Sequence, residues 1–245
     1  MMAPLSTSHR IAEGTLVIDL GTRMRVLSSA PRGGGLRTTR YILNHQVAPD
    51  SVRQGADGRP ESGRHWGDPS RYLRRVAETL EVDRHCVGLM TAVPMKQLVT
   101  GRSILGGIWV ECFATVGVTN AVRAGESLRR MDNEPADRTV GTINLILITN
   151  ACLAAPALVC AVQVVTESKT GLLRDHAVPS WTGRSGATGT GTDAVVVACA
   201  LKGAGPWYPY AGTHTEIGSM IGRVTAECLT RGLARATQWA AQHRS

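Results

Sequence analysis

The sequence predicts a single α/β domain in which a mixed β-sheet, or more than one, is covered by long amphipathic helices. Runs of β-branched and apolar residues alternate with segments of helical periodicity along the 245-residue chain, as is typical of α/β folds. The length permits a substantial core, and the 43% of hydrophobic residues is ordinary for a globular protein. The chain shows no internal repeat, so we expect one domain over residues 1–245.

The first third of the chain is predicted to form strands. Thr15–Leu20 is a β-branched run, Met24–Ser28 follows after a tight turn, and polar and apolar residues alternate in Thr38–Val47. Residues 49–69 are rich in Gly, Pro, Asp, Ser and Arg and contain few apolar residues. This composition predicts a mobile surface loop.

The middle of the chain continues the alternation of helix and strand. Pro69–Leu80 has helical spacing, and Cys86–Val93 and Ile104–Val118 resemble strands, the latter interrupted by glycines. Residues 129–138 form a polar turn before Thr142–Thr149, which is almost continuously apolar. Such a run predicts a central strand that is buried on both faces.

Two long amphipathic helices are predicted in the remainder of the chain. The first runs from Ala155 to Arg174, and Lys169 falls towards its apolar side. A lysine in that position either snorkels past the core or points into a cleft. After a buried strand at Asp193–Leu201, the last helix runs from His214 to Trp239, and residues 213–216 fit a capping box.

Composition argues against several classes of partner. The net charge of +8 comes almost entirely from arginines spread along the chain, and the single Phe leaves the basic stretches without stacking platforms. We therefore expect no nucleic-acid partner. The longest apolar stretch, Ala151–Val165, is too short to cross a membrane, and the N-terminal residues have no apolar core, so we expect no secretory signal. We expect no membrane partner and a cytoplasmic location.

The six cysteines are scattered, with no pair at the spacing of a zinc site. Most lie in apolar segments, which predicts buried, reduced thiols and no metal.

Polar loops flank the predicted strands. Ala187–Asp193 (ATGTGTD) is not a phosphate loop, because it precedes a strand rather than a helix. It can still expose backbone N–H groups and hydroxyls, and its Asp either braces the turn or serves a site. Thr115–Asn120, Gly141–Asn144, Thr149–Asn150 and Ala211–Thr215 have similar polar character. Because α/β folds build sites from loop ends, we expect these segments to converge in one pocket.

In order and spacing, these segments resemble the adenosylcobinamide amidohydrolase (CbiZ) family, over roughly Thr15 to Gly232. The segments that carry the resemblance are Ser28–Gly34, Asn44–Val47, Glu111–Gly125, Gly141–Asn144, Thr149–Asn150, Thr166–Lys169, Ala187–Asp193 and Ala211–Thr215. The chain departs from the family pattern in its longer segment at residues 49–69, and in Glu216, where the family more often has Lys. We therefore assign no chemistry to residue 216.

The resemblance implies cleavage of the amide that joins aminopropanol to the corrin ring, giving adenosylcobyric acid for cobalamin salvage. It implies a corrinoid substrate and no cofactor, because the cobalt is part of the substrate. A non-catalytic corrinoid-binding protein is the alternative, and a homo-oligomer is left open.

We expect the reacting amide between the 188–193 loop and His214. His214 is the predicted general base or acid, and Asp193 orients it or activates water. Thr192 is a less favoured nucleophile, and Lys169 or Glu167 holds the leaving amine. The predicted substrate-binding residues supply amide, hydroxyl or backbone groups: Asn120, Asn144, Asn150, Thr188, Gly189, Thr190, Gly191 and Thr213.

Overall fold

The computed structural model of the protein describes residues 7–47, 68–127 and 141–242. The polar turn predicted at 129–138 lies outside the described residues, as does the loop predicted at 49–69 except for its last two residues. Asp68 caps the first helix and Pro69 begins it. The elements are β1 Ser8–Ala12, β2 Thr15–Ser28, β3 Gly35–Gln46, α1 Pro69–Thr79, β4 Val87–Thr91, η1 Met95–Gln97, β5 Val99–Leu105, β6 Ile108–Val116, β7 Ala121–Val122, β8 Ile143–Thr149, β9 Cys152–Leu153, α2 Ala155–Asp175, β10 Gly189–Thr190, β11 Ala194–Cys199, β12 Trp207–Tyr208 and α3 Glu216–Gln242.

One mixed sheet organises the domain, as predicted. Its strand order is β4-β3-β2-β11-β8-β6-β5, and β1 pairs with β2. The pairs β3/β4 and β8/β11 are parallel, whereas the other neighbouring strands are antiparallel. β8 is buried along its whole length, which confirms it as a central strand.

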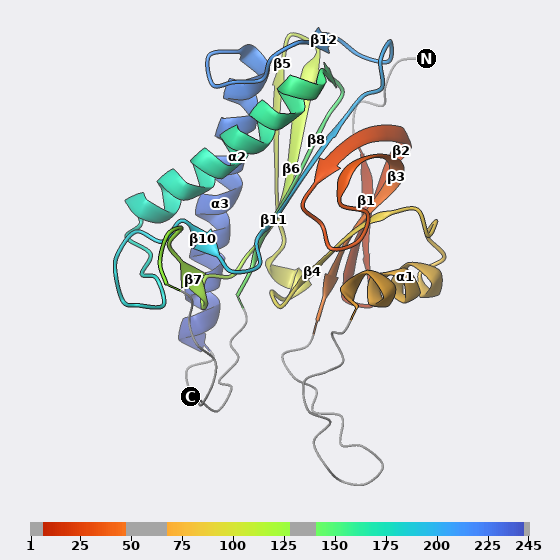
Figure 1. The fold of residues 1–245 in the computed structure, drawn as a ribbon. Coiled ribbons are helices and arrows are strands. Elements are labelled where there is room, and N and C mark those ends of the chain that lie inside the picture. The colour runs from red at the N-terminus through yellow and green to blue at the C-terminus, as the bar shows by residue number, and fades with distance from the viewer. Residues whose placement is uncertain (1–6, 48–67, 128–140, 243–245) are drawn as a thin grey trace, which may run out of the picture.

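The sheet folds over on itself at β2. The pairing of β2 with β3 shifts register between Asp19 and Met24, and Gly21 there has a φ of 73°. The amide nitrogen of Asn144 on β8 then donates to the carbonyl of Met90 on β4, although the two strands are far apart in the strand order. In Figure 1, β1–β4 accordingly stand beside the half of the sheet formed by β5, β6, β8 and β11.

Three apolar cores hold the resulting layers together. The first packs α2 and α3 against β6, β8 and β11, and includes Val165 and Ile221. The second, which includes Ile42 and Ile146, lies between the two halves of the sheet. The third packs α1 against β2 and β3. The order of layers is thus helices, half-sheet, half-sheet, helix (Figure 1).

Two local predictions were wrong. Ile104–Val118 is not one strand: Gly106 and Gly107 have φ values of 56° and 81° and turn the chain between β5 and β6. A glycine pair adopts this left-handed backbone without steric cost, which makes a hairpin. The capping box is also displaced, because Thr215 rather than Thr213 accepts the backbone N–H of Gly218 at the start of α3.

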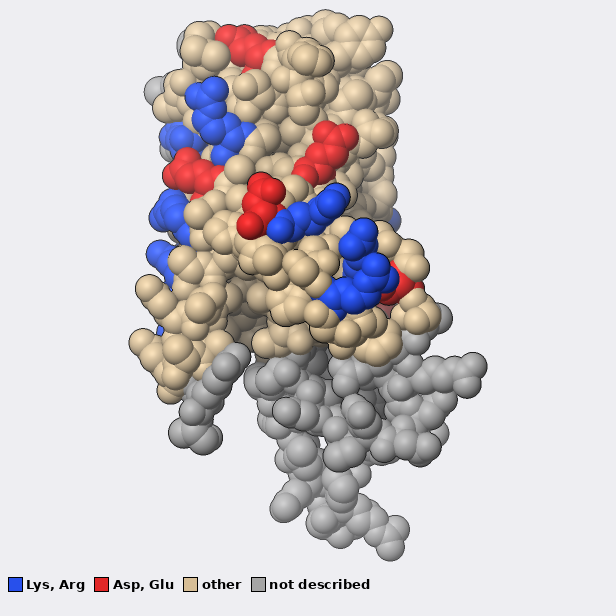
Figure 2. Space-filling view, turned by 90° about the vertical axis from the view of Figure 1, so that its left-hand side faces the viewer, with Lys and Arg blue, Asp and Glu red and all other residues tan. Residues whose placement is uncertain are grey.

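The predicted helices and the predicted buried thiols were confirmed. The helices at 69–80, 155–174 and 214–239 are present with ends within a few residues. The cysteines are free thiols, and all but Cys160 are buried. None of the described helices combines the length and apolarity needed to cross a membrane. Figure 2 shows basic and acidic groups interspersed on the side formed by α2 and α3.

Strand direction determines which loops meet. Because β8 and β11 are parallel and β6 is antiparallel to β8, the start of β8, the start of β11 and the end of β6 share one edge. We call this the Asp193 edge, and the opposite one, where β8 and β11 end, the His214 edge. In Figure 1, β7 and β10 lie near the Asp193 edge, whereas β12 lies at the His214 edge.

Candidate active site

A buried ion pair lies at the Asp193 edge. Lys169 projects from α2, and its Nζ lies 2.5 Å from Oδ2 of Asp193, with 9% of each side chain exposed. Thr190 donates its hydroxyl to Oδ1 of Asp193 over 2.5 Å. We call these three residues the Asp193 cluster. Lys169 therefore does not snorkel to solvent, and instead of pointing into a cleft it is buried against the carboxylate of the loop.

The Asp193 carboxylate is fully engaged. Besides Lys169 and the Thr190 hydroxyl, it accepts the backbone N–H of Ile143 over 2.9 Å and that of Thr190 over 3.0 Å. Since a carboxylate has about four acceptor positions, no position is left over. Asp193 thus ties α2, the 187–193 loop and the start of β8 to one another.

The glycines of the loop permit this close packing. A Cβ on Gly189 would lie 2.4 Å from Oδ2 of Asp193 and 2.9 Å from Nζ of Lys169. Thr188 fixes the other side of the loop, because its hydroxyl accepts the N–H of Ala124 and its carbonyl accepts the Thr170 hydroxyl. The loop is therefore fixed by three contacts, with the Asp193 carboxylate, the N–H of Ala124 and the hydroxyl of Thr170.

Thr192 and Gly191 lie at the exposed tip of the loop. The N–H of Thr192 faces the Thr190 hydroxyl oxygen at 3.4 Å, and its carbonyl accepts the Thr142 hydroxyl. The hydroxyl in contact with the carboxylate thus belongs to Thr190, which we had predicted only as a substrate-binding residue.

A second polar group lies nearby, between the half-sheets. Asn144, on β8, donates to Oδ1 of Asn44 over 2.9 Å, and Asn44 donates to the hydroxyl of Thr115 over 3.1 Å. The Oδ1 atoms of Asn144 and Asn120 are both buried, and neither accepts a hydrogen bond within the described part of the chain. A buried acceptor of this kind favours a donor from water or a ligand.

Sequence reasoning did not single out Asn44 and Thr115 as site residues. The available signal was their place in the segments Asn44–Val47 and Glu111–Gly125, which carry the family resemblance. The neighbouring His45 points the other way: its ring nitrogens contact the hydroxyls of Thr15 and Tyr72, and burial lowers its pKa. Because side chains alternate along a strand, fixing His45 outward directs Asn44 inward.

The predicted pairing of His214 with the 188–193 loop was wrong. His214 is exposed just before α3, which begins at the His214 edge. It is separated from Asp193 by the full length of β11, about 20 Å at the usual rise per residue.

The His214 edge also holds two of the predicted substrate-binding residues. Thr213 lies beside His214, and Asn150 follows the end of β8. There Asn150 accepts the N–H of Trp109 and donates to the carbonyl of Gly107, bracing the β5–β6 turn.

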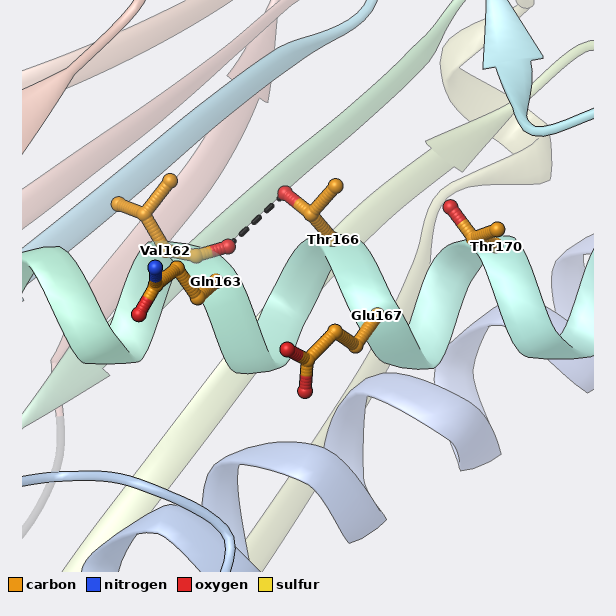
Figure 3. A pocket seen from close by; sticks show the side chains of 5 residues that line it. All are labelled: Val162, Gln163, Thr166, Glu167 and Thr170. Carbon is orange, nitrogen blue, oxygen red and sulfur yellow. Dashed lines mark hydrogen bonds between the residues drawn. The ribbon is translucent and has the colours of Figure 1, made fainter. Parts of the chain in front are cut away.

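Glu167 is also apart from the Asp193 cluster. It lies on the exposed face of α2, two residues from Lys169 and on the opposite side of the helix. With Val162, Gln163, Thr166 and Thr170 it lines an open groove of about 490 Å³ (Figure 3). The predicted single pocket is therefore replaced by separate polar groups at the two edges and on α2.

Within residues 7–47, 68–127 and 141–242, His, Cys, Asp and Glu side chains do not gather in threes that could bind an ion.

The chain is similar to known proteins over nearly its whole length. The model of the adenosylcobinamide amidohydrolase (CbiZ) family matches residues 2–241. An uncharacterized protein of Methanocaldococcus jannaschii is 27% identical over 239 residues, covering 90% of this chain and 86% of its own length. An adenosylcobinamide amidohydrolase of Methanosarcina mazei is 28% identical over 232 residues, covering 92% and 96%. Among solved structures, a β-aminopeptidase of Burkholderia sp. aligns with 96% of this chain and 81% of its own, at 14% identity and a TM-score of 0.43.

Proposed function

The chain belongs to the adenosylcobinamide amidohydrolase family and is an amidohydrolase, and from this premise we propose its reaction. It hydrolyses the amide between aminopropanol and the corrin ring of adenosylcobinamide. The products are adenosylcobyric acid, which re-enters cobalamin synthesis, and free aminopropanol. Water is the only co-reactant, and we propose no cofactor beyond the cobalt that the substrate carries.

The observation that carries the proposal is the Asp193 cluster. A hydroxyl, a carboxylate and an ammonium group lie in one chain of 2.5 Å contacts, at the edge of the sheet where several loops meet. These are a nucleophile, a proton acceptor and a proton donor, which amide cleavage requires. The scissile amide is on a flexible side arm of the corrin, so the arm alone has to reach the cluster.

In the first step the Thr190 hydroxyl oxygen attacks the amide carbonyl carbon. Its proton passes to Oδ1 of Asp193, to which it already donates. The C–N bond breaks as Lys169 gives a proton to the leaving nitrogen, and an ester with Thr190 is formed. We assign the N–H of Thr192, which lies beside the Thr190 hydroxyl oxygen, the role of donating to the developing oxyanion.

In the second step water attacks the ester. The Thr190 oxygen leaves and recovers a proton from the water, whose oxygen becomes part of the carboxylic acid. The proton held by Asp193 returns to Lys169 across their contact, which restores the starting state. We assign Asn120, whose buried acceptor oxygen has no partner within the described part of the chain, the role of receiving an N–H donor of the substrate arm.

Replacing the proposed nucleophile tests this function. Thr190→Ala should lower kcat for adenosylcobinamide by at least about 10³-fold, because residues acting as a catalytic unit have effects of this size. Thr190→Ser keeps the hydroxyl and should stay within about tenfold of the wild type. The measurement is chromatographic release of aminopropanol.

Thr192→Ala is the matched control, because it removes an exposed neighbouring hydroxyl that is not among the hydrogen-bond donors to the Asp193 carboxylate. The mechanism is contradicted if Thr190→Ala turns over normally. A wild-type protein that binds adenosylcobinamide yet releases no aminopropanol would instead support a non-catalytic corrinoid-binding protein.

A further inference from the structure

The start of β8 contacts several parts of the proposed site. The carbonyl of Thr142 accepts the N–H of Gly117 over 2.9 Å, and the N–H of Ile143 donates to Oδ1 of Asp193 over 2.9 Å. The Thr142 side chain is buried, and its hydroxyl donates to the carbonyl of Thr192 over 2.9 Å. The first residues of this central strand therefore hold both the carboxylate of the cluster and the loop that precedes it.

The backbone before Thr142 is tightly packed. A Cβ on Gly141 would lie 2.7 Å from the carbonyl oxygen of Gly117 and 2.7 Å from the backbone nitrogen of Thr119. Glycine permits so close an approach of two backbones because it has no Cβ. The Thr142 hydroxyl thus projects from a backbone that its neighbours fix, which makes it a rigid anchor for Thr192.

The tip of the 187–193 loop is exposed. Gly191 and Thr192 both face solvent, and a Cβ built on Gly191 would have no atom within 4 Å. Within the described part of the chain, the Thr142 hydroxyl makes the only hydrogen bond that reaches either residue from outside the loop. Segments with few buried contacts are the ones that move most readily. The position of the Thr192 backbone therefore depends on Thr142.

We infer that Thr142 is a positioning residue for the proposed hydrolysis. Its hydroxyl holds the Thr192 backbone so that the Thr192 N–H stays beside the Thr190 hydroxyl oxygen, with 3.4 Å between nitrogen and oxygen. The inference rests on the proposed function, in which this N–H donates to the oxyanion formed when Thr190 attacks. Thr142 acts through Thr192 and is assigned no contact with the substrate.

A donor to an oxyanion is effective only when its position is fixed before the reaction. Loss of one such donor typically lowers kcat by about 10²–10³-fold, and a misplacement of about 1 Å can cost about 10²-fold. The negative charge develops only in the transition state, so the loss falls on kcat and not on substrate binding. Without its anchor, the Thr192 N–H should therefore support a lower kcat at an unchanged KM.

Thr142→Val tests the inference, because it removes the hydroxyl and keeps the shape of the side chain. It should lower kcat for aminopropanol release by about 10–100-fold and leave KM within about threefold of the wild type. Thr142→Ser restores a hydroxyl and should keep kcat within about threefold of the wild type. Circular dichroism and denaturant unfolding check that both variants are folded at the temperature of the assay.

Thr170→Val is the matched control, because it removes a hydroxyl that bonds to the other end of the same loop. Thr170 donates to the carbonyl of Thr188 over 3.2 Å, and Thr188 has a second anchor in the N–H of Ala124. The control should therefore keep kcat within about threefold of the wild type. A Thr170→Val enzyme as slow as Thr142→Val would mean that any loosening of the loop suffices, which would overturn the inference.

Backbone mobility provides a readout that does not depend on turnover. The NMR order parameter of the Thr192 N–H should be about 0.85 in the wild type, as in rigid backbone, and below about 0.6 in Thr142→Val. Thr142→Ser and Thr170→Val should keep the wild-type value. An unchanged kcat or order parameter in Thr142→Val would contradict the inference, whereas normal turnover by Thr190→Ala would contradict the proposed hydrolysis itself.

Discussion

Asp193→Asn should abolish aminopropanol release, whereas His214→Ala should keep it within about threefold of the wild type. An asparagine at 193 removes the negative charge that accepts the Thr190 proton and pairs with Lys169. Loss of such a unit typically costs about 10³-fold or more in kcat. His214 is exposed at the other edge of the sheet and contacts none of these groups.

Both variants are measured by steady-state aminopropanol release from adenosylcobinamide at equal concentrations of folded protein. A His214→Ala enzyme as impaired as Asp193→Asn would move the chemistry to the His214 edge. Thr213→Ala, next to His214 and also exposed, serves as the control for local disturbance there.

Breaking the Lys169–Asp193 pair should also lower the free energy of unfolding strongly. Asp193→Ala leaves a buried ammonium without its partner, which is expected to lower the free energy of unfolding by about 3–5 kcal/mol. Lys169→Met removes the buried ammonium while keeping the length of the side chain. In the Lys169→Met protein, Asp193→Ala should lower the free energy of unfolding by at least about 2 kcal/mol less than it does in the wild type. The reason is that no unpaired ammonium remains.

Denaturant unfolding of the four proteins gives this coupling energy. The exposed pair Arg74–Glu78 on α1, with side chains 49% and 55% exposed, is the control and should show about 0.5 kcal/mol or less. If the effects of the Lys169 and Asp193 changes simply add, the two groups are not coupled in the folded protein.

Much of the fold followed from periodicity. The apolar residues recur with the period of the observed element in the helices at 155–174 and 214–239, and they run almost without interruption in the buried strand at 142–149. The β5–β6 hairpin was missed because Gly106 and Gly107 sit inside an otherwise continuous apolar run, and only their positive φ values reveal the turn. The sequence predicted a tight turn between Leu20 and Met24, but it did not show that the chain continues through this point as one strand, β2, with a shift of register against β3.

The sequence predicted only in part which of these polar residues lie together, because polar loop ends are visible in sequence but strand direction is not. Lys169, Thr190 and Asp193 do meet, and Asn120 and Asn144 share their edge. Asn150 and His214 were predicted to lie with them. However, Ile143 begins β8 and Asp193 precedes β11, whereas Asn150 and His214 come after these strands have ended. Parallel pairing of β8 and β11 sends these two sets of residues to opposite edges.

The most direct measurement is a crystal structure of the Asp193→Asn protein with adenosylcobinamide bound. We expect the amide carbonyl carbon within reach of the Thr190 hydroxyl oxygen, with the aminopropanol nitrogen directed towards Lys169. An aminopropanol arm seated beside His214 or Asn150 would contradict the central claim that the Asp193 edge carries the chemistry.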